Sequence, residues 1–120
     1  MSCKTGEDLL EEARARITEI TPAEVAALRE RGDEAVYLDV REPNEWNLGR
    51  IPGAQFLPRG QLESKIEELI PRDSRVVIYC ARGNRSALAA DTMQQMGYEN
   101  VASMSGGFQQ WAMEGCEVEE

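Results

Sequence analysis

The stretch VVIYCARGNRSALAA, residues 76–90, contains the step from strand to helix on which the rest of the fold depends. Four apolar residues precede Cys80, and an uninterrupted apolar run of this length is typical of a strand buried on both faces. A short loop follows the cysteine, and a helix-like run begins at Asn84. Because a buried strand leading directly into a helix is characteristic of parallel α/β proteins, we expect the thiol of Cys80 at the carboxyl end of such a strand.

The remaining sequence alternates between strand and helix patterns in the same way. AVYLDV (35–40) is a second buried strand, and TPAE (21–24) opens a helix, with Thr as N-cap, Pro at the first helical position and Glu three residues after the cap. Shorter strands are expected at 17–20, 55–57 and 101–104, and further helices over 7–16, 60–70, 84–96 and 106–114. This alternation implies parallel strands joined by crossovers, hence a three-layer α/β sandwich with ligands at the carboxyl ends of its strands.

Charge and cysteine content narrow the class of function. The 120-residue chain has the length of one domain, and its 22 acidic and 13 basic residues give a net charge of −9, which argues against nucleic acid or an anionic membrane as partner. Three cysteines and the lack of any histidine do not suit a disulfide framework, a structural zinc site or Cys-His catalysis. We expect no metal and no organic cofactor. The N-terminal residues lack the apolar run of a signal peptide, so the expected location is the reducing cytoplasm.

The loop CARGNRS (80–86) combines features that activate a thiol. Backbone N–H groups in a tight loop before a helix can converge on an anion, and Gly83 permits the positive φ that such a loop requires. Arg82 and Arg85, the only basic residues next to the thiol in the sequence, and the hydroxyl of Ser86 also favour the thiolate over the thiol. The simpler alternative is that Cys80 is an inert residue at the end of a buried strand. The surrounding arginines and glycine favour a nucleophile.

Three stretches, in order along the chain, resemble the motifs of the rhodanese family. They are YLDVREPNEWNLGRIPGAQFLP (37–58), the loop CARGNRS, and MSGGFQQW (104–111). The resemblance implies a three-layer α/β/α rhodanese-like domain with a five-stranded parallel sheet over residues 17–115, after an N-terminal helical extension (1–16) and before an acidic C-terminal tail (116–120). It also implies a sulfurtransferase that moves a sulfane sulfur from a donor such as thiosulfate to a thiophilic acceptor, either cyanide or a thiol.

The resemblance also implies roles for particular residues. Cys80 matches the cysteine that forms a persulfide, and the loop after it would bind substrate and cradle the sulfur with its amides; this loop comprises Ala81, Arg82, Gly83, Asn84, Arg85 and Ser86. Asp39 and Arg41 match a segment beside the loop and are expected to brace it, with Glu45 as the ion-pair partner of Arg41. The expected partners are a small anionic sulfur donor and a cyanide or thiol acceptor, which includes a protein thiol.

The length of the loop bears on the reaction. Six residues run from Cys80 to Arg85, the length that the resemblance associates with sulfur transfer, whereas phosphatases of the same fold have a loop one residue longer. Ser86 stands where the arginine of those phosphatases would lie. Two alternatives stay open: a non-catalytic binding or regulatory module that uses the same cleft, and a phosphatase or arsenate reductase of the same fold.

Several residues outside the loop are expected to have structural roles. Trp111 belongs to the core, and the glycine pair 106–107 allows a close approach to the cysteine loop. Arg50 stands where the family often has histidine, at a position that is generally structural. Cys3 and Cys116 are expected to be exposed spectator thiols rather than thiols that resolve a persulfide as a disulfide.

Overall fold

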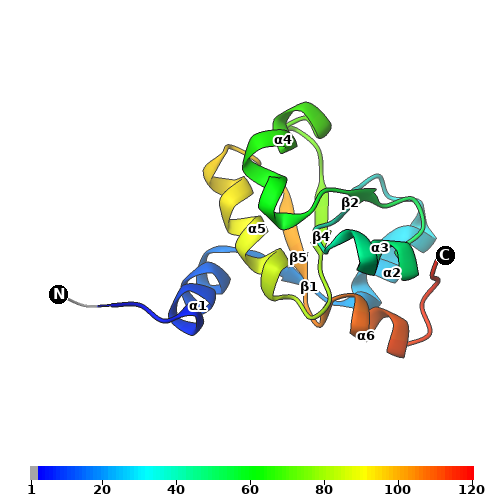
Figure 1. Cartoon of the computed structure of the whole chain (residues 1–120). Coiled ribbons are helices and arrows are strands. Elements are labelled where there is room, and N and C mark those ends of the chain that lie inside the picture. The colour runs from blue at the N-terminus through cyan, green and yellow to red at the C-terminus, as the bar shows by residue number, and fades with distance from the viewer. Residues whose placement is uncertain (1–2) are drawn as a thin grey trace.

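The computed structural model describes residues 3–120 and contains one five-stranded parallel sheet (Figure 1). The strands are β1 (Thr18–Ile20), β2 (Val36–Asp39), β3 (Gln55–Phe56), β4 (Val76–Tyr79) and β5 (Val101–Met104). Their order across the sheet is β1-β5-β4-β2-β3, and every pair is parallel, which confirms the predicted sheet. Asp39 pairs with Tyr79, so β2 and β4 end side by side and the segments that follow them start from the same edge.

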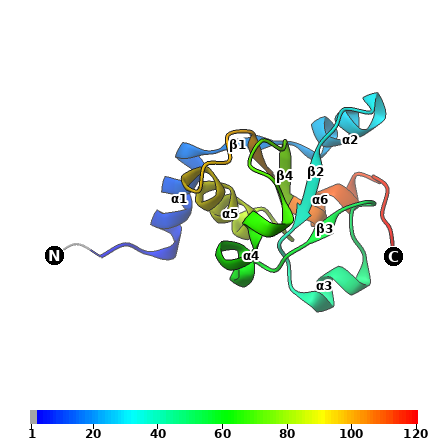
Figure 2. The ribbon, with the colours of Figure 1, turned by 90° about the horizontal axis from the view of Figure 1, so that it is seen from above.

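Helices cover both faces of this sheet (Figures 1 and 2). They are α1 (Gly6–Arg16), α2 (Pro22–Arg31), α3 (Pro43–Leu48), α4 (Leu62–Leu69), which follows a 3₁₀ turn at Arg59–Gln61, α5 (Asn84–Gln95) and α6 (Gly107–Met113). Side chains of β4 and of Cys80, which follows it, alternate between two core clusters: Val76, Ile78 and Cys80 pack on the side of α4 and α5, and Val77 and Tyr79 on the side of α2 and α6. The alternation follows from the period of two of a strand. This arrangement is the predicted three-layer α/β/α fold.

The caps of α2 explain why its limits could be predicted. The Thr21 hydroxyl accepts a hydrogen bond from the Glu24 N–H at 3.1 Å, and the Glu24 carboxylate accepts one from the Thr21 N–H at 3.0 Å. Pro22 occupies the first helical position, where no N–H is needed. At the other end Gly32 takes the left-handed conformation, with φ of 74°.

Helix α3 was not predicted, because six residues are too few to display an apolar period. Its start nevertheless carries two helix-start features. Pro43 is the first helical residue, and the Glu45 carboxylate accepts a hydrogen bond from the Glu42 N–H at 3.0 Å. The helix connects β2 to β3 and carries Glu45 to the edge of the sheet at which β2 ends.

Both ends of the described chain are attached to the body of the domain. Arg16, at the end of α1, donates two hydrogen bonds to the Asp91 carboxylate of α5, at 2.9 and 2.8 Å. Near the C-terminus, Arg50 and Glu119 exchange two backbone hydrogen bonds, at 2.9 and 2.8 Å. The predicted N-terminal extension also includes residues 1 and 2, which lie outside the described part. Within residues 3–120, no helix is both long enough and apolar enough to cross a membrane.

Candidate active site

Cys80 directly follows β4 and is almost completely buried, with 1% of its surface exposed. Its Sγ accepts hydrogen bonds from two backbone N–H groups, that of Gly83 at 3.1 Å and that of Ser86 at 3.3 Å. Ser86 lies in the first turn of α5, where backbone N–H groups have no partner within the helix and the helix dipole is positive. The sulfur therefore occupies a site that favours negative charge.

The turn between Cys80 and α5 depends on Gly83. This residue has φ of 100°, a conformation that residues with a side chain disfavour, and it is the N-cap of α5. A Cβ atom at this position would lie 3.4 Å from the Gly106 backbone nitrogen. The positive φ expected from the sequence is thus confirmed, and it directs the Gly83 N–H back toward the sulfur.

A second loop, at the start of α6, is hydrogen-bonded to the backbone of the cysteine loop. The Cys80 carbonyl accepts a hydrogen bond from the Phe108 N–H at 2.7 Å, and the Ala81 carbonyl accepts one from the Gln109 N–H at 3.0 Å. No described peptide bond is cis, so the N–H group of each of these peptides points away from α6. The predicted close approach of the glycine pair 106–107 is confirmed, because a Cβ on Gly107 would lie 2.5 Å from the Cys80 carbonyl oxygen.

We expect Gly107→Ala to destabilise the fold more than Gly115→Ala, its matched control. Both glycines have positive φ, 60° and 77°, and an alanine there costs about 1–2 kcal/mol. Only at Gly107 does the added methyl group also collide with the backbone of the cysteine loop, which adds about 1–3 kcal/mol. Urea unfolding of both variants measures the difference. Equal losses of unfolding free energy would contradict the tight contact between the two loops.

Two buried hydroxyl groups continue the hydrogen bonding around the sulfur. Ser86 Oγ lies 3.5 Å from Cys80 Sγ and 2.8 Å from Ser103 Oγ, and both serines are fully buried. Ser103 lies on β5, the neighbour of β4 in the sheet. Ser86 is a predicted site residue, whereas Ser103 was not predicted, because it resembles an ordinary strand residue until the pairing of β4 with β5 is known.

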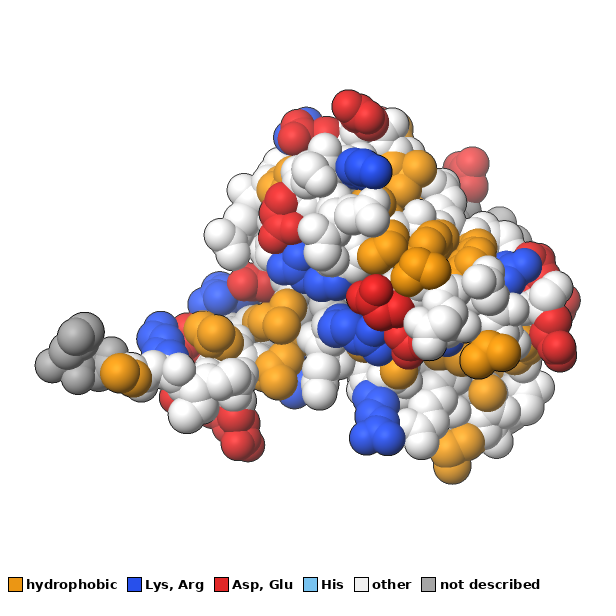
Figure 3. Space-filling model, in the orientation of Figure 1, with side chains coloured by type: hydrophobic (Ala, Val, Ile, Leu, Met, Phe, Trp, Pro, Cys, Tyr) orange, Lys and Arg blue, Asp and Glu red, His pale blue; other side chains and the backbone are white. Residues whose placement is uncertain are grey.

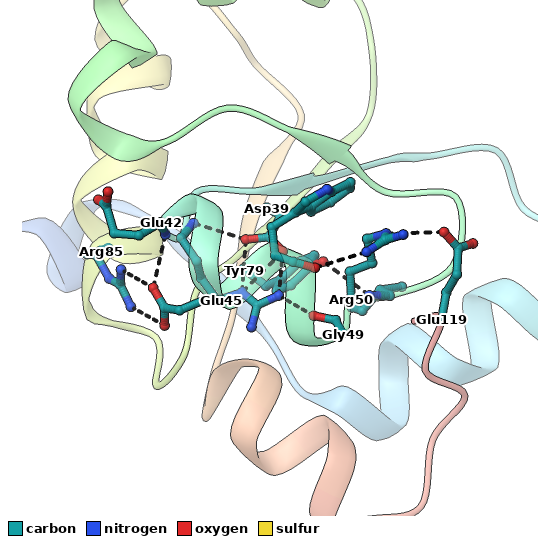
Figure 4. A network of polar contacts seen from close by, with 11 residues as sticks. Asp39, Glu42, Glu45, Gly49, Arg50, Tyr79, Arg85 and Glu119 are labelled. Atoms are coloured by element: carbon teal, nitrogen blue, oxygen red, sulfur yellow. Dashed lines mark hydrogen bonds and ion pairs between the residues drawn. The ribbon is translucent and has the colours of Figure 1, made fainter.

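Asp39 and Arg41 form a buried ion pair beside the cysteine loop. The Arg41 guanidinium donates to the Asp39 carboxylate at 2.8 to 3.1 Å and to the carbonyl of Gly49, at 2.6 Å. It also lies over the ring of Phe108, 4.4 Å from its centroid. Burial, followed by the charge of Asp39, raises the pKa of Tyr79, whose hydroxyl accepts a hydrogen bond from a backbone N–H of the β2–β3 connection. Figure 4 places Asp39, Gly49 and Tyr79 in one polar network.

The expected pairing of Glu45 with Arg41 is wrong, because Glu45 pairs with Arg85 of the cysteine loop (Figure 4). Two hydrogen bonds join the two side chains, at 2.9 and 3.2 Å. The hydrogen bond from Arg85 lowers the pKa of Glu45, which is therefore ionised at neutral pH. Arg41 instead donates its side-chain hydrogen bonds to Asp39 and to the Gly49 carbonyl. Helix α3 explains why Glu45 pairs with Arg85 rather than with Arg41, since it directs Glu45 toward the start of α5.

The other cations at the loop differ in how they are held. Arg82 is exposed and forms no ion pair with any residue in 3–120. Arg14 of α1 donates a hydrogen bond to the Asn84 side chain at 2.7 Å and so adds a basic residue that sequence analysis missed. Figure 3 shows basic side chains over the start of α5, next to acidic ones on the side of α3. The loop thus has a mixed surface charge.

The other two cysteines lie apart from this arrangement. Cys116 is only partly buried and packs with the core cluster on the side of α2 and α6, and Cys3 is exposed. Burial, followed by the charge of Glu114, raises the pKa of Cys116, which disfavours its thiolate. The expectation that both are exposed is thus wrong for Cys116. Trp111 is buried in the same cluster, as predicted.

An open cavity of about 500 Å³ lies near the site but does not include it. Residues of α3, β3 and α4 line it, among them Pro43, Phe56 and Leu69, and Cys80 is not part of its wall. Among residues 3–120, no group of three or more His, Cys, Asp or Glu side chains is placed to hold a metal ion.

Comparison with known proteins places this chain in a family. Residues 21–114 match the rhodanese-like domain, so the chain belongs to the rhodanese-like family. The thiosulfate sulfurtransferase GlpE of Pseudomonas fluorescens is 36% identical over 92 residues, which cover 77% of this chain and 82% of GlpE. Together these findings support a rhodanese-family sulfurtransferase.

Two further relatives qualify this assignment. The probable adenylyltransferase/sulfurtransferase MoeZ of Mycobacterium tuberculosis is 35% identical over 100 residues, but this chain spans only 25% of its length. A solved structure from Rhodopseudomonas palustris, RPA3614, matches 99% of this chain and 97% of its own, with a TM-score of 0.90 and 38% identity. It is described as a protein of unknown function, "Possible Tyrosine Phosphatase".

Proposed function

We propose that this protein transfers a sulfane sulfur from a donor such as thiosulfate to a thiophilic acceptor through a persulfide on Cys80. The observation that carries the proposal is the position of Cys80 Sγ, which accepts hydrogen bonds from the backbone N–H groups of Gly83 and Ser86 at the start of α5. Such groups stabilise a thiolate without a histidine base. The relatives named sulfurtransferase support the same reaction.

The reaction proceeds in two displacements on sulfur. The Cys80 thiolate attacks the outer sulfur of thiosulfate, the sulfur–sulfur bond of the donor breaks, and sulfite leaves with the bonding electrons. The persulfide on Cys80 then gives its outer sulfur to cyanide or to a thiolate, and thiocyanate or a new persulfide forms as the Cys80 thiolate is released. Both steps conserve electrons between donor and acceptor, so no other oxidant or reductant is needed. A covalent intermediate of this kind predicts ping-pong kinetics.

Some of the surrounding residues stabilise charge on the sulfur, and others support the cysteine loop. The loop from Ala81 to Ser86 supplies amides for the thiolate and for the persulfide, because the contacts with α6 turn the first carbonyls of the loop away from the site. The buried ion pair of Asp39 and Arg41 supports this loop through Phe108, whose ring lies against the Arg41 guanidinium and whose N–H donates to the Cys80 carbonyl. A small anionic donor and a cyanide or thiol acceptor, including a protein thiol, are the proposed partners, and the cytoplasm stays the predicted location.

Mass spectrometry of the intact protein tests the proposal directly. After incubation with thiosulfate, the protein should gain one sulfur atom, and peptide mapping should place it on Cys80. Addition of cyanide should remove that sulfur and release thiocyanate. A protein that takes up no sulfur, or takes it up on another cysteine, would contradict the mechanism.

Arginine substitutions test the electrostatic part of this mechanism. Arg85→Ala is expected to lower kcat/KM for thiosulfate about tenfold to a hundredfold, because a charge-assisted contact is lost and Glu45 is left unpaired beside the loop. Arg82→Ala should have a smaller effect, since Arg82 is exposed and acts mainly on donor capture. Arg31→Ala, which breaks an exposed ion pair with Asp33, is the control. Normal turnover of thiosulfate by both loop variants would refute this role of charge.

A phosphatase is the second candidate, favoured by the description of the Rhodopseudomonas palustris protein as "Possible Tyrosine Phosphatase". The six-residue loop from Cys80 to Arg85 and the serine at position 86 argue against it. A purely binding module is a weaker candidate, because its function would not require a buried cysteine whose sulfur accepts two backbone hydrogen bonds.

A further inference from the structure

Arg85, a cation in the first turn of α5, is already neutralised by an acidic residue of the same chain. Arg85 and Glu45 form a two-point ion pair, and 35% and 27% of their side chains are exposed. The pair joins the cysteine loop to α3, across the edge of the sheet where Cys80 lies. Figure 4 shows the Arg85 guanidinium facing the Glu45 carboxylate. An anion that approaches the loop therefore meets a guanidinium whose charge is offset by Glu45 and two of whose five N–H donors already bind that carboxylate.

The other charged residues near the loop do not change this neutralisation of Arg85 by Glu45. Asp39 and Arg41 are buried and paired with each other, so Arg41 forms no ion pair with Glu45 and neither residue is exposed to an incoming donor. Arg82 is exposed to solvent, where a single cation contributes little. A donor anion gains the full electrostatic attraction of the Arg85 guanidinium only if it displaces the Glu45 carboxylate. That carboxylate would then lie unpaired beside a second negative charge.

We propose that Glu45 is a specificity-determining residue that competes with the donor for Arg85 and so selects for donors of low negative charge. The inference rests on the proposed sulfur transfer and deepens it by naming the preferred donor class. Thiosulfate carries two negative charges, whereas a thiosulfonate or an organic or protein persulfide carries one at its transferable sulfur. The penalty imposed by Glu45 grows with the charge of the donor, so the singly charged class is the preferred one.

Two donors that differ by one charge make the test specific. Thiosulfate and methanethiosulfonate both offer a terminal sulfur on an oxidised sulfur atom, and they release sulfite and methanesulfinate respectively. The measured quantity is the ratio of kcat/KM for thiosulfate to kcat/KM for methanethiosulfonate, with cyanide as acceptor at low ionic strength, where charge effects are least screened. The ratio cancels any loss of active protein that affects both donors equally.

Glu45→Gln should raise this ratio about three- to tenfold, since the glutamine keeps an oxygen for the Glu42 N–H but loses the charge. Glu63→Gln is the matched control, because it removes one carboxylate that also makes two hydrogen bonds with an arginine, Arg59, on another part of the surface. The control should leave the ratio unchanged. An unchanged ratio in Glu45→Gln, or an equal rise in the control, would overturn the proposal.

A double-mutant cycle keeps the test decisive if the single variant folds poorly. Arg85→Gln should lower the ratio, and adding Glu45→Gln to it should raise the ratio much less than Glu45→Gln does in the wild-type background, because Glu45 then has no arginine to occupy. An equal rise in the two backgrounds would exclude competition for Arg85. Failure of the wild-type protein to take sulfur from either donor would instead overturn the sulfurtransferase proposal itself, together with the donor preference that rests on it.

Discussion

Cys80→Ser is expected to abolish sulfur transfer, lowering the thiosulfate:cyanide rate on the order of 10³-fold or more while leaving the fold intact. Serine is close to cysteine in size, and its hydroxyl can accept the hydrogen bonds that the Gly83 and Ser86 N–H groups now donate to Sγ. It cannot form a persulfide. The measurements are steady-state thiocyanate production, the mass of the protein after thiosulfate treatment, and the midpoint of urea unfolding.

The other two cysteines provide the controls for this variant. Cys116→Ser should stay close to wild type because Cys116 packs on the α2 and α6 side of the sheet and burial raises its pKa. Cys3→Ser should also behave like the wild type, since Cys3 is exposed near the start of the chain. Appreciable sulfur transfer by Cys80→Ser would end the persulfide hypothesis. A large loss in either control would give that thiol a resolving role.

The position of Cys80 was predictable because two physical rules meet there. An uninterrupted apolar run marks a strand buried on both faces, and parallel strands joined by crossovers present their carboxyl ends at one edge of the sheet. The tight turn could also be foreseen from Gly83, since few other residues adopt its φ of 100°. The local rules thus define where the thiol lies and how the chain leaves it.

The ion pairs of the site could not be predicted from the sequence, because they depend on how separate elements dock. Asp39 and Glu45 are both near Arg41 along the chain, and sequence spacing alone does not decide between them. The unpredicted helix α3 decides it by directing Glu45 toward Arg85, which lies 40 residues later. Arg14 likewise reaches Asn84 only because α1 lies against α5.

These tertiary contacts change the electrostatic interpretation of the loop. From the sequence, Arg85 is a free cation that attracts an anionic donor, whereas in the fold its guanidinium is held by Glu45. In the proposed mechanism, negative charge on Cys80 Sγ is therefore stabilised more by the fixed N–H groups of Gly83 and Ser86 than by arginine charge. Fixed donors in a buried site require no rearrangement during the reaction, so they are the more effective contribution.

The size of the loop should separate sulfur chemistry from phosphate chemistry. The backbone N–H groups of Gly83 and Ser86 lie 3.1 and 3.3 Å from a single sulfur atom, and the loop from Cys80 to Arg85 has six residues. A transferred phosphoryl group needs donors for three equatorial oxygens, and hence a wider ring of amides. We therefore expect the wild-type protein to take one sulfur from thiosulfate and to hydrolyse no aryl phosphate.

Inserting one glycine between Gly83 and Asn84 should reverse part of this selectivity. The insertion separates the Gly83 amide from the start of α5, so the Gly83 and Ser86 N–H groups can no longer both reach Cys80 Sγ. Loss of one such donor lowers a rate about 100- to 1,000-fold, and we expect sulfur transfer to fall by this factor while weak aryl phosphate hydrolysis emerges. A glycine inserted after Gly32, at the exposed end of α2, controls for the insertion itself and should leave sulfur transfer near the wild-type rate. Wild-type phosphatase turnover comparable to sulfur transfer would refute the assignment, because loop length would then not determine which substrate reacts at Cys80.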